Sequence, residues 1–334
     1  MLLRKLRCSL AGLVTAGLIT STALAQSLSG DMPPESGEFR VGVMPWLGYG
    51  QWYVAQEHGF FNENGLDGVE IINFAEDKDI NAALVSGDLD GASIALHTAM
   101  AMKSAGVPIQ IVSMLDVSEH ADAMIANGEV DSLEALAGKS IAFEEGSTSD
   151  ILLRDALKSV GLSFADIQAV PMPASTAGSA LISGRVPVAV TYEPYLSTAR
   201  ANDADVQVLY DGGDNLGLIS DVFVVRDEVA KNRPGQVLAM IESWDQAVKH
   251  YHDSPQKDQA IIAEAVGADV GSLKSAFDGV KYYGLADSEE AFHGNFISQT
   301  FADVLKAAQE AGFVQGEMSS DELIGTRFVE ALSP

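Results

Sequence analysis

The sequence has little positive charge and almost no cysteine. Its 334 residues include 20 Lys and Arg against 47 Asp and Glu, which gives a formal net charge of −27. So acidic a chain offers no basic surface to a nucleic-acid backbone or to an anionic membrane, and we expect neither as a partner. The single cysteine, Cys8, excludes a disulfide framework and a cysteine-ligated zinc site.

The sequence also lacks an apolar run long enough to cross a membrane. The longest candidate, residues 10–19, is shorter than the roughly 20 residues that a span needs. It follows three basic residues and precedes Ala23-Leu24-Ala25, which has the small-x-small pattern of a cleavage site. These features predict a signal peptide over residues 1–25 and export to the periplasm, with Cys8 lost on cleavage.

The remaining chain alternates short apolar runs with segments of helical periodicity, which is typical of α/β proteins. The polar, Pro/Gly-rich residues 26–38 are expected to form a flexible leader. Three blocks follow, at 39–125, 126–218 and 219–334. We predict that the first block and the mostly helical third block build lobe 1, that the second block builds lobe 2, and that two hinge crossovers near 123–130 and 216–222 join them.

An aromatic loop follows the first predicted strand. Residues 45–53 hold two of the three Trp and two of the eight Tyr of the chain. Ligands of open α/β sheets bind beyond the carboxyl ends of strands, where aromatic rings can stack on an organic ligand or hold a cation. We therefore predict that Trp46 and Tyr49 contact a ligand, and that Trp52 or Tyr53 packs inward.

Acidic residues stand at the ends of other predicted strands. They each follow or begin an apolar run, with little basic charge beside them, and they are Asp116, Glu144, Glu145, Glu193 and Asp221. A carboxylate inside a cleft needs a cationic or hydrogen-bond-donating partner, so these residues favour an ammonium group. Glu193 could instead hold its own lobe together.

A second group of candidates suits the anionic end of a ligand. Gly146, Ser147 and Thr148 precede an amphipathic segment, and a helix N-terminus offers free N–H groups to an anion. Simple N-capping explains them equally well. His97 and Thr98 follow another strand and could bond a ligand, although a capping or core role fits His97 just as well.

The chain shows no pattern for a metal, a cofactor or a catalytic centre. His250 and His252 are two residues apart on a predicted helix and face different ways, whereas His58 and His120 stand alone. Gly-x-Ser-x-Gly is absent, and no Walker or Rossmann glycine pattern follows a strand. We therefore expect no metal, no cofactor and no enzymatic activity.

Several short segments, in order, resemble one family of proteins. They are Val41-Gly42-Val43 with Trp46-x-Gly48-Tyr49, Ala55-x-x-x-Gly59-Phe60-Phe61, residues 83–90 (ALVSGDLD), residues 136–142 (LAGKSIA), and Tyr192-Glu193-Pro194-Tyr195. Over residues 39–225 the chain is similar to the periplasmic solute-binding proteins of the nitrate/sulfonate/taurine and thiamine-precursor class, with Tyr192 in place of the common Trp.

The resemblance implies a two-lobed α/β fold of the type II periplasmic-binding-protein kind, with the ligand cleft between the lobes. It also implies delivery of a small solute to an inner-membrane ABC permease with its ATPase, and it adds Tyr192 to the ligand-binding candidates. We expect a monomer that binds a taurine-like zwitterion or an amine. The alternatives are an aliphatic sulfonate, a thiamine-precursor pyrimidine, or a sensor that presents its ligand to a receptor.

Overall fold

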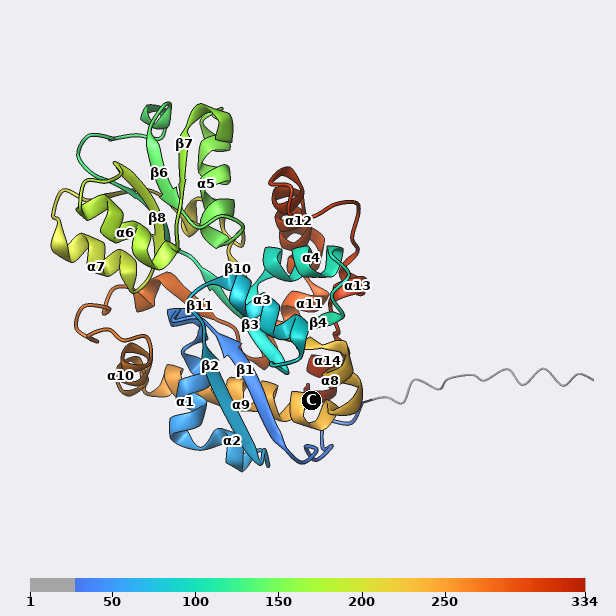
Figure 1. Cartoon of the computed structure of the whole chain (residues 1–334). Helices are drawn as coiled ribbons and strands as arrows, with labels where there is room; N and C mark the ends of the chain where they lie inside the picture. The colour runs from blue at the N-terminus through green and yellow to red at the C-terminus, as the bar shows by residue number, and fades with distance from the viewer. Residues whose placement is uncertain (1–27, 334) are drawn as a thin grey trace, which may run out of the picture.

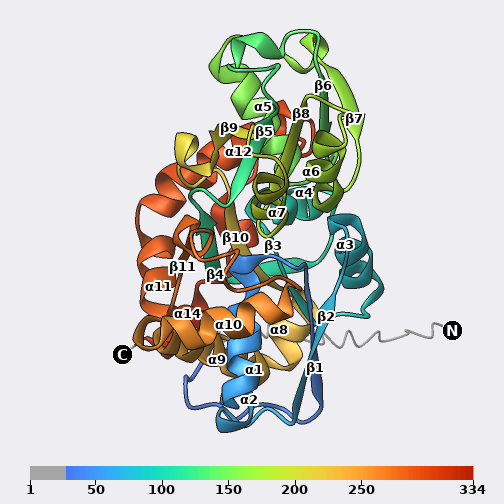
Figure 2. The ribbon, with the colours of Figure 1, turned by 90° about the vertical axis from the view of Figure 1, so that its left-hand side faces the viewer.

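The computed structural model describes residues 28–333 and divides them between two α/β lobes, each built around one sheet (Figures 1 and 2). The predicted signal peptide lies outside the described residues. Sheet A of lobe 1 has the strand order β2-β1-β3-β10-β4-β11, and sheet B of lobe 2 has the order β7-β6-β8-β5-β9. The strands are β1 (Glu38–Val43), β2 (Gly68–Asn73), β3 (Gly91–Ala95), β4 (Ile109–Ser118), β5 (Asp122–Ala126), β6 (Ser140–Phe143), β7 (Gln168–Pro171), β8 (Val188–Tyr192), β9 (Gln207–Asp211), β10 (Ser220–Arg226) and β11 (Val280–Tyr282).

Helices flank both sheets. Those of lobe 2 are α5 (Thr148–Ser159), α6 (Ala174–Ile182) and α7 (Tyr195–Asn202). Those of lobe 1 are α1 (Gln51–His58), α2 (Phe60–Glu63), α3 (Asp77–Ser86), α4 (Leu96–Ser104), α8 (Asp227–Asn232), α9 (Pro234–Asp253), α10 (Pro255–Ala265), α11 (Leu285–His293), α12 (Phe301–Glu310), α13 (Ser320–Leu323) and α14 (Arg327–Leu332). A π-helical turn, Phe296–Thr300, leads into α12, and 3-10 turns lie at Leu47–Tyr49, Glu134–Leu136, Phe164–Asp166, Gly212–Asn215 and Phe277–Gly279.

The two sheets share one topology. In each, one strand lies between the next two strands of the chain and pairs with both in parallel, as β1 does with β2 and β3, and β6 with β7 and β8. In each, the strand that arrives from the other lobe is antiparallel to its neighbours, as β10 and β5 are. The strand order therefore reverses at β1 and at β6, and ligands of open α/β sheets bind at such points.

The chain passes from lobe 1 to lobe 2 earlier than the sequence suggested. The connection between β4 and β5 is residues 119–121, and β5 belongs to sheet B, so the expected boundary at 125/126 and the hinge at 123–130 were placed too late. The reason is that two buried apolar strands, residues 109–118 and 122–126, are separated by only three residues. Such a short separation is typical of neighbouring strands in one lobe. The return passage lies between β9 and β10, over residues 212–219.

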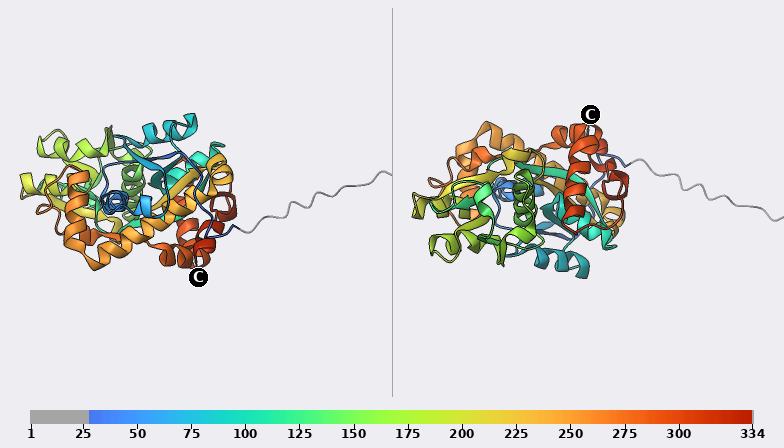
Figure 3. Two further views of the ribbon diagram at one scale, coloured as in Figure 1. Left: turned by 90° about the horizontal axis from the view of Figure 1, so that it is seen from below. Right: turned by 90° about the horizontal axis from the view of Figure 1, so that it is seen from above.

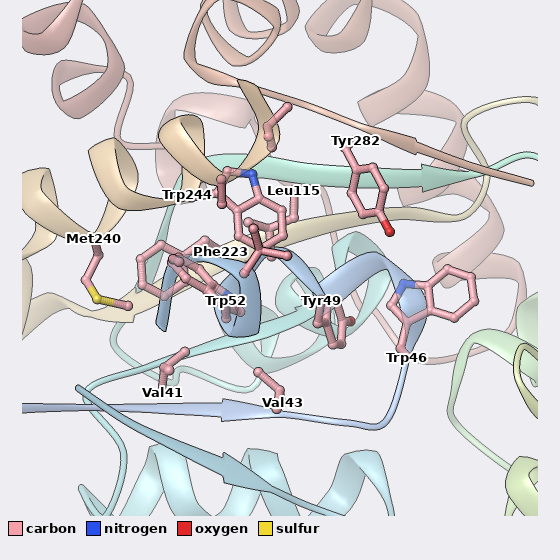
Figure 4. Packing of buried hydrophobic residues seen from close by; sticks show 14 of the residues in the cluster. Val41, Val43, Trp46, Tyr49, Trp52, Leu115, Phe223, Met240, Trp244 and Tyr282 are labelled. Carbon is pink, nitrogen blue, oxygen red and sulfur yellow. The ribbon is translucent and has the colours of Figure 1, made fainter. Parts of the chain in front are cut away.

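The core of lobe 1 fixes the end of the aromatic loop. Trp52 of α1 is fully buried, with its ring 4.6 Å from that of Trp244 and 5.1 Å from that of Phe223, measured between centroids (Figure 4). Its Nε1–H donates to Ser93 Oγ at 2.8 Å. Tyr53, the next residue, is partly exposed and accepts a hydrogen bond from Asn73. Trp52 is thus the aromatic residue of this pair that packs inward.

The described part of the predicted flexible leader packs against lobe 1. The Glu35 carboxylate accepts hydrogen bonds from the backbone N–H groups of Gly235 and Gln236 at the N-terminus of α9. Those N–H groups have no partner within the helix, and a carboxylate there is also stabilised by the helix dipole. The sequence did not suggest this contact, because the partner of Glu35 lies 200 residues away in sequence.

The C-terminal helices extend along one side of lobe 1 and reach lobe 2. Helix α12 packs against α4 and also contacts α5, and Lys158 of α5 pairs with Glu310 of α12 (Figure 2). Seen from above and from below, the C-terminus lies at the periphery of the molecule (Figure 3). The third block thus returns to lobe 1, and it also adds the short edge strand β11 to sheet A.

Candidate functional site

A cleft lies between the lobes, where the carboxyl ends of the central strands of both sheets meet. The lobes leave a cavity of about 30 Å³ there, room for only a water molecule or two. It is lined by Met44, Trp46, Tyr49, Asp77, Ala95, Asp122, Glu144, Ser147, Thr148, Ser149, Ala174, Tyr192, Ile219 and Asp221. Its position matches the strand-order reversals at β1 and β6.

Aromatic residues of both lobes meet at the cleft. Trp46 and Tyr49, from the loop after β1, line it together with Tyr192 at the end of β8. The rings of Trp46 and Tyr192 meet edge to face, with their centroids 6.0 Å apart. Because each comes from a different lobe, this contact exists only when the lobes are closed. The structure therefore presents the closed conformation of the cleft.

Asp116 holds the aromatic loop from behind. Its Oδ1 accepts a hydrogen bond from Trp46 Nε1–H at 3.1 Å. Gly48 makes this possible, since a Cβ at that position would collide with Trp46 Nε1 and the Asp116 carboxyl. Asp116 is fully buried and does not line the cleft, and its Oδ2 has no hydrogen-bond partner among the described residues. Asp116 thus positions a binding residue, where the sequence suggested a direct ligand contact.

Four carboxyl groups line the cleft, and burial raises the pKa of each. Burial and the neighbouring carboxylates raise the pKa of Asp77 to about 7, and burial raises that of Asp122 to about 7 against an opposing hydrogen bond from Ser118. Burial and the Asp116 charge raise the pKa of Asp221 well above its usual range. Burial also raises the pKa of Glu144, in spite of the hydrogen bond from the backbone N–H of Ala174.

No basic side chain balances these acids within the cleft. Neither Lys nor Arg occurs among the lining residues of the part of the chain that the structure describes. Lys78 lies outside this lining and its charge opposes the rise in the pKa of Glu144, but its side chain is 70% exposed and pairs with Glu76. The cleft is therefore electrostatically negative whenever its acids are ionised, and a bound cation would lower their pKa values.

The N-terminus of α5 forms the hydroxyl-rich side of the cleft. Ser147 is the N-cap, since its Oγ accepts a hydrogen bond from the backbone N–H of Ser149. Ser149 Oγ in turn accepts from the N–H of Glu144, and Asp150 accepts from the N–H of Gly146. The helix end thus caps itself, as the alternative interpretation held, while Ser147, Thr148 and Ser149 still line the cleft.

Several predicted ligand contacts lie away from the lining. His97 and Thr98 are buried in α4, where His97 faces Phe313 and burial lowers its pKa to about 4; Ala95 lines the cleft in their place. Glu193 does not line the cleft, because its carboxylate accepts hydrogen bonds from the N–H and hydroxyl of Ser197. Gly146 does not line it either.

The structure brings Trp46, Tyr49, Ser147, Thr148, Tyr192 and Asp221 together at the cleft, as the sequence predicted. Sequence reasoning missed Asp77 and Asp122. Asp77 has the appearance of an ordinary acid in the first turn of a helix. Asp122 is the first residue after the crossover, and a correctly placed hinge would have identified it.

The histidines also differ from expectation. His58 was predicted to stand alone, yet the structure places it beside His250, with the ring centroids 3.9 Å apart. Asp258 bonds to both. The sequence hides this cluster because its members come from three different helices.

Known proteins resemble this chain in sequence and in structure. The model of the family described as NMT1/THI5 like matches residues 48–258. A binding protein of Brucella abortus (strain 2308) is 26% identical over 239 residues, which is 71% of this chain and 74% of that protein. The taurine-binding periplasmic protein of Escherichia coli (strain K12) is 23% identical over 287 residues, 83% of this chain and 88% of that protein.

Among solved structures, the periplasmic aliphatic sulphonate binding protein of Escherichia coli superposes with a TM-score of 0.72 at 20% identity. The match covers 87% of this chain and 93% of that one. The likeness shows a shared two-lobed fold. Among residues 28–333, every helix is too short or too polar to cross a membrane.

Proposed function

Because the chain belongs to the NMT1/THI5-like family, we propose that it is the periplasmic substrate-binding component of an ABC importer. In this proposal it is exported through a cleaved signal peptide and captures a small organic amine, cationic or zwitterionic, by closure of the two lobes. It then delivers the amine to an inner-membrane permease with its ATPase. It acts as a binding protein, with no catalytic step.

The charge of the cleft carries the proposal. Asp77, Asp122, Glu144 and Asp221 line one small cavity with no Lys or Arg among its described lining residues. Desolvating several carboxylates is costly unless a positive group compensates them. An ammonium group at this point supplies both the charge and the N–H donors, and it gains most when the cleft is closed and dry.

The aromatic residues support the same ligand class. Trp46, Tyr49 and Tyr192 present ring surfaces beside the carboxylates, and ring faces attract alkylammonium groups. The hydroxyls of Ser147, Thr148 and Ser149 suit the opposite, anionic end of a zwitterion at the N-terminus of α5. A taurine-like molecule satisfies both ends.

The alternatives fit this cleft less well. An aliphatic sulfonate without an amine would leave the carboxylates without a counter-charge, although relatives include proteins named for sulfonates. A thiamine-precursor pyrimidine could stack on Trp46 or Tyr49 but would leave the acids to be paired by neutral amino groups. A sensor role would use the same ligand and a different membrane partner.

Isothermal titration calorimetry with matched ligands tests the proposal. Taurine carries both groups, ethanesulfonate lacks the amine and 2-aminoethanol lacks the sulfonate. We expect ligands with an ammonium group to bind and ethanesulfonate to bind at least tenfold more weakly than taurine. Binding of ethanesulfonate that equals or exceeds that of both amines would refute an amine-binding cleft and favour the sulfonate alternative.

A further inference from the structure

A cluster of metal-ligating side chains lies in lobe 1, outside the cleft. His58 ends α1, His250 lies near the end of α9, and Asp258 lies in α10. Helix α1 packs against both α9 and α10, which brings the three side chains together. One ligand atom from each lies within 4.8 Å of the others.

The two imidazoles contact the two oxygens of one carboxylate. His58 Nε2 lies 3.0 Å from Asp258 Oδ1, and His250 Nδ1 lies 2.7 Å from Asp258 Oδ2. Ligand atoms that share a zinc ion at about 2.0–2.2 Å are separated by about 3–3.5 Å, which is close to this arrangement. Two imidazoles and one carboxylate are a common ligand set for zinc and other first-row transition metals.

The burial of Asp258 gives the cluster a reason to bind a cation. Its side chain is 0% exposed, and among the described residues its carboxylate bonds only to the two imidazoles. A buried carboxylate is costly unless a positive group compensates it. A divalent ion supplies the missing charge.

Access from solvent is open on the histidine side. The side chain of His250 is 30% exposed and that of His58 is 13% exposed. An ion can therefore enter past His250, and water can complete its coordination there. Each ring nitrogen that now donates to Asp258 would carry no proton in the metal-bound form, and the proton of a neutral imidazole would move to the other ring nitrogen.

We propose that His58, His250 and Asp258 form a binding site for one divalent transition-metal ion, with zinc as the preferred ion, that ties α1 to α9 and α10. The site lies at the far end of the helix that follows the aromatic loop. Gly50, just before α1, packs against Ile262 of α10. The metal would thus stabilise the scaffold that carries Tyr49, and this role is independent of which solute the cleft binds.

Metal titration of the full mature chain, free of any affinity tag, tests the site. We expect Zn²⁺ to bind with a stoichiometry of one ion per chain and a micromolar or lower Kd, and to raise the melting temperature by several degrees. Mg²⁺ should have no such effect, because it prefers oxygen ligands. Co²⁺ should give the visible absorption of a low-coordinate nitrogen and oxygen site.

Matched variants make the test specific. His58→Gln and His250→Gln should each weaken Zn²⁺ binding at least tenfold, whereas His252→Gln should not, because His252 is exposed on the same helix outside the cluster. Circular dichroism and the ligand affinity of each variant check that it folds. The proposal is wrong if the unaltered chain takes up less than half an ion, or if both cluster variants bind Zn²⁺ as the His252→Gln control does.

Discussion

The two lobes repeat one sheet topology but bring different chemistry to the cleft. In lobe 1 the acids have few partners, since Asp77 has no hydrogen-bond donor among the described residues and Asp221 has only the Tyr49 hydroxyl. In lobe 2, Glu144 accepts from the backbone N–H of Ala174 and Asp122 is bonded by Ser118. The carboxylates of lobe 1 therefore have fewer hydrogen-bond partners without a ligand than those of lobe 2, and they gain more from a bound cation.

This difference suggests an order of binding. A cation that enters the open cleft gains most from lobe 1, where Asp77 lacks a donor, Asp221 has only the Tyr49 hydroxyl, and Tyr49 also offers its ring. Lobe 2 then adds the contacts that exist only on closure, namely Tyr192 and the hydroxyls of α5. A ligand can shift the open–closed equilibrium only through such differential contacts. The following predictions test this asymmetry, from the largest expected effect to the smallest.

The largest effect should be that of pH. Asp77 and Asp122 have a pKa of about 7 in the folded chain, far above the unfolded value of 3.8. Between these values the ligand-free folded chain holds protons that the unfolded chain has lost, so its free energy of unfolding falls as pH rises from about 4 to above 7. Cation affinity should change in the opposite direction and weaken below pH 7 by up to about tenfold per pH unit for each acid that must ionise on binding.

Calorimetry and thermal melts from pH 5 to pH 8.5 check both slopes. Asp77→Asn and Asp122→Asn should each flatten the stability profile in this window, because each removes one titrating group. A ligand-free stability that rises steadily from pH 5 to pH 8 in the unaltered chain would show that these acids are not held protonated by the cleft.

The next largest effect should be the loss of amine affinity when one cleft acid is neutralised, and it should differ between an acid of lobe 1 and an acid of lobe 2. Asp77→Asn should weaken amine binding about 30-fold, which corresponds to about 2 kcal/mol for a charge-assisted contact. Glu144→Gln should weaken it less, about three- to fivefold, because the backbone of Ala174 already satisfies part of that carboxylate. Titration at pH 8, above the pKa of about 7 of Asp77, measures the two ratios.

Asp253→Asn serves as the control for removal of one negative charge. Asp253 is exposed at the end of α9 and does not line the cleft. The amine affinity of the Asp253→Asn variant should match that of the unaltered chain. If Glu144→Gln is as damaging as Asp77→Asn, the asymmetry between the lobes does not govern binding.

Much of the fold could be read from local patterns. The alternation of apolar runs and helical periods predicted an α/β chain, and strands and helices alternate in this way in both lobes. The first crossover was misplaced because β4 and β5 are both apolar and only three residues apart. The docking of the leader and the edge strand β11 depend on long-range partners that no local pattern reveals.

The site was predictable where a residue stands at a strand end and has an unusual side chain. Trp46 and Tyr49 follow β1, and their aromatic character distinguishes them from an ordinary loop. His97, Glu193 and Asp116 occupy similar positions, but their side chains bond within the lobe or lie behind the loop. Local sequence patterns predict where a strand ends. Whether a side chain at that end points into the cleft depends on tertiary packing, which those patterns do not reveal.

A smaller effect should follow removal of the bond behind the aromatic loop. Trp46→Phe keeps a ring at the cleft but removes the Nε1–H that bonds Asp116. We expect amine affinity to fall about three- to tenfold, because the ring loses its fixed orientation and the buried carboxyl loses its donor. Calorimetry measures the affinity, and Tyr192→Phe, which keeps its ring on the lobe 2 side, is the matched control and should change affinity less.

The smallest effect on amine affinity should come from the cap of α5. Ser147→Ala removes the side chain that accepts from the N–H of Ser149, so the free energy of unfolding should fall by about 1 kcal/mol. Affinity for 2-aminoethanol should stay within about twofold, because lobe 1 holds the ammonium group. Affinity for taurine should fall more, because Ser147 lies at the end of the cleft that suits an anion. Equal losses for both ligands would show that the two lobes do not divide the cationic and anionic ends of the ligand between them.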